Sequence, residues 1–496
     1  MNDFSDIFII GGGINGAAIA SDAAGRGLNV TLCEQGDLAS GTSSASTKLI
    51  HGGLRYLELY EFHLVKSALR EREILLRKSP NLVSPLEFIL PHEKHLRPAW
   101  MIRLGLFLYD HLSARKYLPR SHAVNFKTDP RGAALLPQFE KGFSYYDCFT
   151  DDARLTILNA ISAKEYGAKI LTHTQFLSAE RENNLWKITL KNAAALQPTI
   201  CYAKALVNAA GPWINQVQKN IVGQAEFSIK LVKGSHIIVP KLYDGDFAYI
   251  LQNKDGRIVF TIPYQDKFTL IGTTDILYSS NPRDAKISAE EQNYLCAIIN
   301  EYFKKKILPG DIVWSYAGVR CLQNEAEGNL SKISRDHKLV LDTNTSAPLL
   351  AVIGGKITTH RILAEEVLNQ LKLFFPAMKS AWTASTPLPG GDCSLDKLRI
   401  QLKKEFSWLP DELINRYSKN YGTRAYLILK DVYSLQQLGT DFSAGLYQKE
   451  VDYLVNHEWA VSCDDVLWRR TKLGLFFTEQ AKIKLTNYLL HFNKTT

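Results

Sequence analysis

Residues 6–35 have the sequence DIFIIGGGINGAAIASDAAGRGLNVTLCEQ, in which an apolar run precedes a glycine turn, a run of small residues and a second apolar run. This order predicts a strand, a helix and a parallel strand, the βαβ unit of an α/β sheet. Gly11, Gly13 and Gly16 supply the spacing G-x-G-x-x-G. Glycine is needed there because the turn is tight, a pyrophosphate must approach bare backbone, and the helix must pack closely on its strand. The stretch therefore predicts a nucleotide-binding domain.

Glu34 ends the second predicted strand, 18 residues after Gly16. A carboxylate in this place accepts hydrogen bonds from a ribose diol and disfavours the 2′-phosphate of NADP, so FAD and NAD are the candidates. Residues 203–217 and 347–368 each place an apolar strand before another glycine turn, in AKALVNAAGPWINQV and APLLAVIGGKITTHRILAEEVL. Two further glycine turns let backbone amides reach the rest of a long cofactor, which favours FAD.

The composition limits the class of protein. The chain has 496 residues, of which 46% are hydrophobic and 22% charged, as in a globular protein. Its net charge of +9 suits nucleic acid, phosphorylated metabolites or lipid headgroups as partners. The sequence has no basic tail and no nucleic-acid-binding motif, so we expect no nucleic-acid partner.

Cysteine usage and the N-terminus indicate the compartment. The seven cysteines are widely spaced and contain no CxxC pair, so we expect a reducing compartment and no metal site. The start MNDFSDIFIIGGG lacks the basic region and cleavage site of a signal peptide. No stretch approaches the roughly 18 uncharged apolar residues of a transmembrane helix. We therefore expect a chain that does not span a bilayer, although it could lie on one.

Further motifs follow in order from about residue 5 to residue 475, namely HGGLRYLE, DDARLTILNA, LVNAAGPW, VKGSHIIVP, IGTTD, YAGVR, ISRDH, GGKITTHR and EVDYLVNHEWAVSCDDVLWRRTKLGL. With these motifs the chain resembles the D-amino-acid-oxidase-type flavoproteins and, within them, the FAD-dependent, aerobic glycerol-3-phosphate dehydrogenases. The resemblance implies an α/β fold with a Rossmann-type FAD-binding domain, an antiparallel-sheet substrate domain and a helical C-terminal domain.

The resemblance also implies an activity. It is the oxidation of sn-glycerol 3-phosphate to dihydroxyacetone phosphate by hydride transfer to FAD, with electrons passed to ubiquinone or menaquinone. We expect a peripheral protein at the cytoplasmic face of the bacterial inner membrane, with a cytoplasmic fraction, and a homodimer. The alternatives are an oxidase of the same substrate that uses oxygen, an amine or amino-acid oxidase of this fold, and a non-enzyme with structural FAD.

Oxidation of an alcohol phosphate on a flavin needs cations for the phosphate and a group that takes the hydroxyl proton. Arginine suits phosphate oxygens because its planar fork donates hydrogen bonds in pairs, whereas lysine is a point charge. The resemblance places the following residues around the substrate: Arg55, Tyr56, His236, Arg320, Arg335 and Lys356.

The catalytic roles divide among three of these residues. His236 is a candidate proton acceptor because an unperturbed imidazole has a pKa of about 6.5, and Lys356, His51 or water are alternatives. Arg320 is expected to stabilise negative charge on the C2 oxygen, since arginine remains protonated. The family usually has proline after GVR, where this chain has Cys321. Loss of a fixed φ would loosen the loop that carries Arg320 and weaken substrate affinity.

Hydroxyls and amides of Thr42, Ser43 and Ser46 are candidates for phosphate contacts, although such residues also cap helices. Gly355, Thr358 and Thr359 are expected to cap the helix after GGK and face the pyrimidine edge of the flavin, where the helix dipole stabilises a reduced anionic flavin. The full set expected to bind the cofactor is Gly11, Gly13, Gly16, Glu34, Thr42, Ser43, Ser46, His51, Gly211, Gly355, Thr358 and Thr359.

Residues 95–119 predict a basic helix with an apolar stripe. The stripe consists of Trp100, Met101, Leu104, Phe107, Leu108 and Leu112, and the flanking cations are Arg97, Arg103, Arg115 and Lys116. Such a helix belongs either to a core or to a membrane interface. The net charge and the quinone acceptor implied by the resemblance favour the membrane interface.

The motifs divide the chain into three predicted domains. A discontinuous FAD-binding domain takes residues 1–90, 150–225 and 330–380, and a substrate domain takes residues 91–149 and 226–329. Alternating stretches such as SIKLVKGSHIIVP and RIVFTIPYQDKFTLIGTTD predict the antiparallel sheet of the substrate domain. STPLPGGD predicts a linker, and DELINRYSKNYG and KEVDYLVNHEWA predict helices of a C-terminal domain at residues 388–496.

Overall fold

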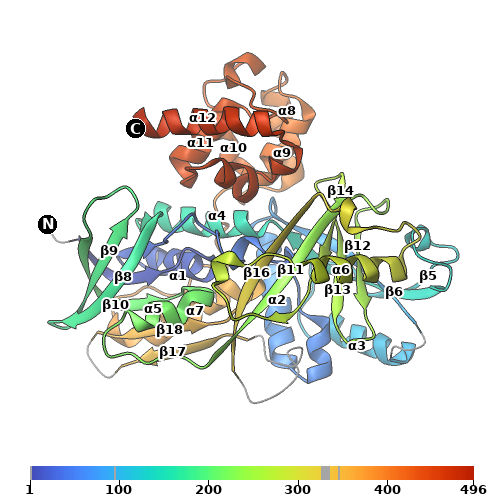
Figure 1. The fold of residues 1–496 in the computed structure, drawn as a ribbon, viewed down its shortest axis with the longest axis horizontal. Helices are drawn as coiled ribbons and strands as arrows, with labels where there is room; N and C mark the ends of the chain where they lie inside the picture. Colours follow the sequence, from blue (N-terminus) through green and yellow to red (C-terminus); the bar gives the residue numbers. More distant parts are fainter. Residues whose placement is uncertain (1–2, 94–96, 325–335, 344–346, 496) are drawn as a thin grey trace.

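The computed structural model describes residues 3–93, 97–324, 336–343 and 347–495. Figure 1 shows two sheets side by side, with a helical domain above the place where they meet. The predicted α/β architecture with an antiparallel second sheet and a helical C-terminal domain is confirmed.

The first sheet is built around the N-terminal strand. Within the described residues its eight strands are β1 (Asp3–Ile10), β2 (Val30–Cys33), β7 (Lys169–Leu171), β8 (Thr174–Glu182), β9 (Leu185–Asn192), β10 (Thr199–Asn208), β17 (Lys338–Asp342) and β18 (Leu349–Ile353). The order is β17-β18-β10-β1-β2-β7, and the β8–β9 hairpin pairs onto β10. β18, β10, β1, β2 and β7 run parallel, so their carboxyl ends meet at one edge.

The predicted βαβ unit forms because its helix has a surface of small residues. Helix α1 (Ile14–Gly25) packs against α4 (Asp152–Glu165) and α7 (His360–Leu371), and its alanines are buried in the same core as the sheet. The small side chains of α1 allow these close helix contacts. The four residues Ile7–Ile10 of β1 are all buried as well. The short helix α5 (Ile214–Lys219) follows β10.

The second sheet is mostly antiparallel. Its ten strands within the described residues are β3 (Leu49–Ile50), β4 (Val83–Pro91), β5 (His122–Asn125), β6 (Lys141–Thr150), β11 (Ile229–Pro240), β12 (Phe247–Gln252), β13 (Ile258–Tyr264), β14 (Phe268–Gly272), β15 (Ile276–Leu277) and β16 (Trp314–Gln323). β11, β13 and β14 confirm the strands expected from the two alternating stretches. β3 and β4 also pair here, although they lie in the segment 1–90 assigned to the FAD-binding domain.

Three helices accompany the second sheet, namely α2 (Phe62–Lys78), α3 (Ala99–His111) and α6 (Ala289–Tyr302). The helix expected over residues 95–119 is therefore shorter than the pattern suggested. The described helices include none with the length and hydropathy that crossing a bilayer requires.

The C-terminal domain has its own hydrophobic core. Its helices are α8 (Leu395–Glu405), α9 (Asp411–Tyr421), α10 (Ala425–Ile428), α11 (Gln448–Glu458) and α12 (Glu479–Thr495), with a π-helix at Asp465–Arg470. α9 and α11 confirm the two predicted helices, and residues 385–392 contain neither helix nor strand, as expected of a linker.

His337 links the start of edge strand β17 to helix α7. Its Nε2 lies 2.6 Å from a carboxylate oxygen of Glu366, and its Nδ1 lies 3.2 Å from Asp336. Burial lowers the pKa of His337, but hydrogen bonds and attraction from the two carboxylates outweigh it and raise the pKa to about 9. The charged imidazole therefore stabilises the fold.

We predict that this stabilisation is complete below about pH 6.5, the usual imidazole pKa, and is lost as the pH rises towards 9. His337→Gln should lower the free energy of unfolding by about 1 kcal/mol at pH 6, a value discounted for the exposed carboxylates. Denaturant unfolding of both proteins at pH 6 and pH 9.5 measures the difference. A difference that grew with pH would contradict this role for His337.

Candidate active site

A cavity of about 750 Å³ lies between the two sheets. One wall consists of the loops at the carboxyl ends of β1, β2, β10 and β18, and the other wall is formed by β11 and β16. Pockets for small molecules and cofactors span roughly 300–1,000 Å³ and favour this edge of an α/β sheet. The cavity therefore has the place and size expected of a cofactor site.

The glycine turn after β1 accepts no side chain at two positions. Gly11 has a φ of +112°, and a Cβ there would lie 2.6 Å from the carbonyl oxygen of Ala209. A Cβ on Gly16 would lie 1.9 Å from the carbonyl oxygen of Gly11. Gly11 and Gly13 line the cavity, whereas Gly16 lets α1 approach the turn. The predicted functions of close backbone approach and close helix packing thus fall on different glycines.

Glu34 is fixed by backbone amides. One carboxylate oxygen accepts a hydrogen bond from Gly12 N at 2.7 Å, and the other accepts from Gly36 N at 2.9 Å. Burial raises the pKa of this carboxyl, and the two amides oppose that rise. The side chain lines the cavity, so an oriented acceptor stands where a ribose diol was expected.

The loop from Gly41 to Lys48 folds over the start of α1. Ser43 Oγ accepts a hydrogen bond from Ile14 N at 2.9 Å in the first turn of that helix. Thr42 Oγ1 donates to the carbonyl oxygen of Val319, and Ser46 Oγ donates to Asp152 at 2.7 Å. These three residues line the cavity, but the hydroxyl hydrogens of Thr42 and Ser46 are already donated to Val319 and Asp152. Their direct contact with phosphate stays a prediction.

His236 lies at the opposite end of the cavity, on β11. Its ring stacks on Tyr316 with centroids 4.8 Å apart, and Nε2 lies 2.9 Å from Thr47 Oγ1. Nδ1 is buried and has no hydrogen-bond partner among the described residues. Burial, followed by the charges of Lys48 and Arg320, lowers the pKa of His236 well below 6.5. The imidazole is therefore neutral at neutral pH, as a base requires.

Cations surround this end of the cavity. Arg320 lies on β16 and forms an ion pair with Asp275, while Lys356 Nζ lies 3.8 Å from the ring centroid of Tyr56. Lys356 follows Gly354 and Gly355, whose φ values of +76° and +100° turn the chain after β18. Arg320, Lys356 and Tyr56 all line the cavity. The sheet thus presents positive charge beside a neutral base.

Several predicted positions need correction. Arg320 and Cys321 lie in strand β16, paired with Val232 and Leu231, so the expected loosening of a loop at Cys321 does not apply. Arg55 lies on the 3₁₀ turn Leu54–Leu59, directly before Tyr56 of the cavity wall, and its contact with the substrate stays a prediction.

The helix after GGK also differs from the expectation. Thr359 occupies the N-cap position of α7 but makes no side-chain capping bond and lies outside the cavity wall. Thr358 Oγ1 instead accepts a hydrogen bond from His51 N at 3.2 Å. His51, Gly211, Gly355 and Thr358 line the cavity, and their contact with the cofactor stays a prediction. Arg335 lies outside the described residues.

Part of the cavity wall was not predicted from the sequence. Besides the predicted Arg320, β16 contributes further residues to the wall, namely Trp314, Tyr316, Ala317, Gly318, Val319, Cys321 and Leu322. Strand residues two apart share a side, but this wall includes consecutive residues of β16, so alternation in WSYAGVR does not identify it. No local pattern indicated Thr47, Lys48 or the residues of the C-terminal domain that line the cavity, namely Asp464, Trp468, Arg469 and Lys472.

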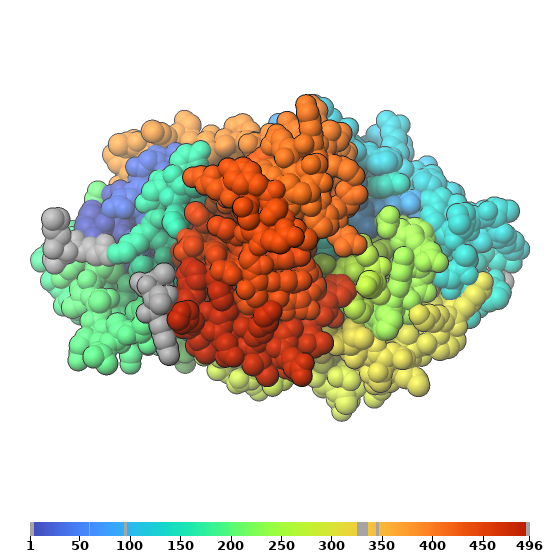
Figure 2. Space-filling model, turned by 90° about the horizontal axis from the view of Figure 1, so that it is seen from above, coloured from blue at the N-terminus to red at the C-terminus, as the bar shows by residue number. Residues whose placement is uncertain are grey.

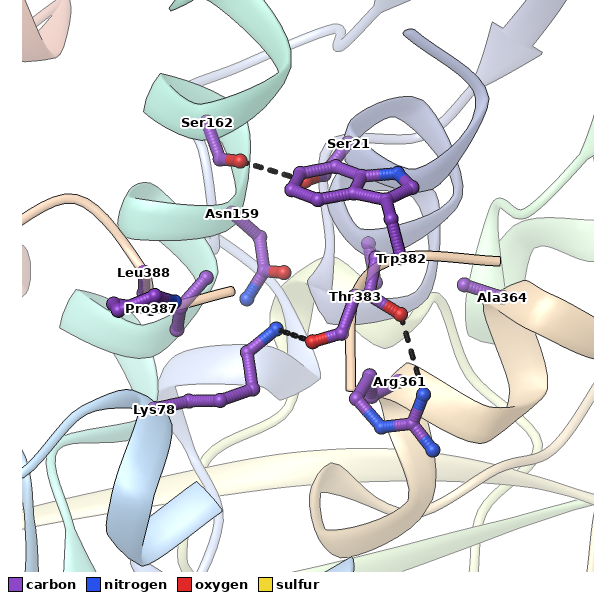
Figure 3. A pocket seen from close by; sticks show the side chains of 11 residues that line it. Ser21, Lys78, Asn159, Ser162, Arg361, Ala364, Trp382, Thr383, Pro387 and Leu388 are labelled. Carbon is purple, nitrogen blue, oxygen red and sulfur yellow. Dashed lines mark hydrogen bonds between the residues drawn. The ribbon is translucent and has the colours of Figure 1, made fainter. Parts of the chain in front are cut away.

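A second cavity is too small for a cofactor. Its volume of about 10 Å³ corresponds to one water molecule. Figure 3 shows Lys78 and Arg361 directed at Thr383 of the interdomain segment, and Ser21 bonded to Ser162. Burial and the charge of Arg361 lower the pKa of Lys78 to about 8. Lys78 and Arg361 thus hold the segment between the domains in place. The large cavity is the one with the size of a cofactor site.

The residues present fit a flavin dinucleotide. Bare glycine backbone and the N-terminus of α1 suit a pyrophosphate, and Glu34 suits a ribose. The third glycine turn, at Gly354 and Gly355, lies near the substrate end, where a ring system would meet the neutral imidazole. The fold and site therefore define a nucleotide-dependent oxidoreductase with a separate substrate sheet.

The chain belongs to the family of FAD-dependent oxidoreductases. The model of that family, described as FAD dependent oxidoreductase, matches residues 6–361. A second model, described as the C-terminal domain of alpha-glycerophosphate oxidase, matches residues 381–489. FAD is thus the cofactor, and the resemblance found in the sequence is confirmed.

Individual proteins agree with the family. The chain is 52% identical to a glycerol-3-phosphate dehydrogenase of Pseudomonas aeruginosa, over 98% of this chain and 94% of that protein. It is 46% identical to a D-erythritol 1-phosphate dehydrogenase of Brucella abortus, over 98% of each chain. The crystal structure of the glycerol-3-phosphate dehydrogenase from Bacillus halodurans, complexed with FAD, superposes with a TM-score of 0.76 at 25% identity, over 98% of this chain and 94% of that one.

Proposed function

We propose that this enzyme oxidises the C2 hydroxyl of sn-glycerol 3-phosphate to the ketone of dihydroxyacetone phosphate and passes the electrons to a membrane quinone. The observation that carries the proposal is the combination of Arg320 and Lys356 with the neutral base His236 at one end of the FAD cavity. Cations suit a phosphate dianion, whereas an amino-acid substrate needs only one carboxylate partner. The Pseudomonas relative has this substrate in its name.

The reaction removes a proton from the hydroxyl and a hydride from C2, and bound FAD supplies the hydride acceptor. His236 takes the proton at Nε2, because Nδ1 is shielded from solvent. Nε2 lies 2.9 Å from Thr47 Oγ1, so the substrate hydroxyl replaces this contact when the ring accepts its proton. Arg320 stabilises negative charge on the substrate oxygen as the proton leaves.

The alternative substrate is a longer polyol phosphate. The Brucella relative is a D-erythritol 1-phosphate dehydrogenase and is nearly as similar as the glycerol-3-phosphate enzymes. Both substrates carry a terminal phosphate and a neighbouring secondary alcohol, so the same cations serve both. The two candidates differ in the length of the carbon chain that the cavity must hold.

The first test is flavin reduction without oxygen. Adding sn-glycerol 3-phosphate should bleach the flavin band near roughly 450 nm, whereas glycerol should leave it yellow. Arg320→Ala should slow bleaching about a hundredfold because a charge-stabilising donor is lost. Arg257→Ala, which removes an arginine paired with Asp255 outside the cavity wall, is the control. Faster bleaching by D-erythritol 1-phosphate would make that compound the preferred substrate. If neither phosphate bleached the flavin, both candidate substrates would be rejected.

The role of His236 predicts a particular pH dependence. Since its pKa is lowered well below 6.5, the ring should stay unprotonated and kcat/KM should not fall between pH 8 and pH 6.5. His236→Asn should slow flavin reduction about 10²- to 10⁴-fold, as loss of a general base does. Stopped-flow reduction across this pH range measures both effects. A wild-type rate that halved near pH 6.5 would indicate an unperturbed imidazole.

Membrane docking and quinone use are supported by an exposed apolar surface around α3. Trp100 is 65% exposed, Leu104 51% and Phe107 53%, and Tyr60 nearby is 81% exposed. Arg103 and Lys116 are also exposed, whereas Arg115 forms an ion pair with Asp110. Aromatic and basic side chains together suit an anionic lipid surface. We place the protein at the cytoplasmic face of the inner membrane, and a homodimer stays a prediction.

We predict that the double variant Trp100→Ser, Phe107→Ser binds anionic phospholipid vesicles about tenfold more weakly, because two exposed aromatic side chains that would enter the lipid are lost. Reduction of vesicle-bound quinone should fall with binding, while flavin reduction by substrate stays unchanged. Tyr433→Ser, on an exposed aromatic of the C-terminal domain, is the matched control. Unchanged vesicle binding would contradict membrane docking through the α3 surface. Peroxide formation at an equal rate without quinone would favour an oxidase that uses oxygen.

A further inference from the structure

The C-terminal domain reaches the cofactor cavity through one short segment. We propose that the π-helix Asp465–Arg470 and the adjoining Lys472 act as a clasp that retains FAD. Three of these residues, Trp468, Arg469 and Lys472, line the cavity. The inference concerns retention of the family's cofactor and does not depend on which substrate is oxidised. Figure 2 shows the domain, in orange and red, lying over the middle of the molecule.

The first contact of the clasp is with Asp37, three residues beyond Glu34. Arg469 Nε lies 2.5 Å from Asp37 Oδ2, and Arg470 donates to both carboxylate oxygens at 2.5 and 2.8 Å. Asp37 and Arg470 are fully buried. Two successive arginines reach one carboxylate in the wider turn of a π-helix, a feature frequent at functional sites.

Asp37 transmits this contact to the FAD-binding turn. It lies in the loop after β2, where Ala39 N donates to the carbonyl oxygen of Gly12 at 3.1 Å. Further along the same loop, Ser43 holds Ile14 N at the start of α1. Gly12 and Ile14, on either side of Gly13 in the glycine turn, are therefore hydrogen-bonded to the loop after β2. The C-terminal domain contacts this loop at Asp37.

The clasp also contacts β16 of the second sheet and the start of α4. Trp468 stacks on Trp314 of β16 with centroids 4.0 Å apart and planes within 8°. Gly474 makes room for this indole, since a Cβ there would lie 2.5 Å from its ring. Lys472 Nζ lies 3.0 Å from Asp151, the N-cap residue of α4. One segment thus joins the FAD loop, α4 and the second sheet.

The contacts of the clasp must break before the loop after β2 can move away from the FAD cavity. Removing one member of a buried charge cluster acts mainly on dissociation rates. Asp37 keeps Arg470 when Arg469 is removed, so the contact weakens without leaving an unpaired charge. Weakening the clasp should therefore speed FAD release more than it alters the fold. A contact that only joined the domains would affect stability without this preference.

The test compares two arginines that join the same domains. Arg469→Met removes a cation from Asp37 and Asp465, and Arg424→Met removes the ion pair with the half-exposed Glu165 of α4, outside the cavity wall. Arg469 is preferred to the fully buried Arg470, whose loss would leave a cavity in the interface. FAD release from diluted holoenzyme is followed as the rise of free-flavin fluorescence, with melting temperatures measured in parallel.

We expect Arg469→Met to release FAD about tenfold faster than the wild type, and Arg424→Met to stay within about twofold. Trp468→Ala should also speed release, and Trp468→Phe should restore most of the retention. Unchanged release from Arg469→Met would overturn the proposal. Equal acceleration by Arg424→Met, or release rates that simply follow the melting temperatures, would overturn it as well. No substrate enters the measurement, so failure of the proposed activity would leave its outcome unaffected.

Discussion

Residues 34–48 leave the first sheet after β2 and enter the second sheet at β3, and buried ion pairs hold this crossing in place. Asp37 is paired with two arginines, and Asp152 is paired with Lys48 at 2.7 Å, with both side chains of the latter pair buried. Removing one partner of such a pair typically costs about 3–5 kcal/mol. Because the crossing carries Glu34, Ser43 and Thr47, the cofactor end and the substrate end of the cavity depend on the same segment.

The charges of the cavity are arranged before any ligand binds. Lys48 is paired with Asp152, and Arg320 is paired with Asp275. Each carboxylate orients the cation beside it and compensates its charge. The same two cations help to keep His236 neutral. The positive charge that suits a phosphate and the neutral state of His236 thus result from the same arrangement of charges.

Much of the fold could be predicted because its signals are local. The glycine turn, the alternating strands β11 and β13, and helices α9 and α11 all follow from periodicity and composition within short windows. The site was only partly predictable. Arg320 was expected in a loop because glycine precedes it, yet pairing with β11 places it in a strand. The expected contact of Arg55 with the substrate stays a prediction, because the structure shows only that its neighbour Tyr56 lines the cavity.

The sequence by itself determined the βαβ unit, the acid at the end of β2 and the order of the glycine turns, since each depends on backbone geometry within a few residues. Only the tertiary structure decided that Thr47 contacts His236 across 189 residues, and that Arg469 and Arg470 hold Asp37. Those partners depend on strand register and on how a separate domain docks. No local pattern encodes either, because both result from packing the whole chain.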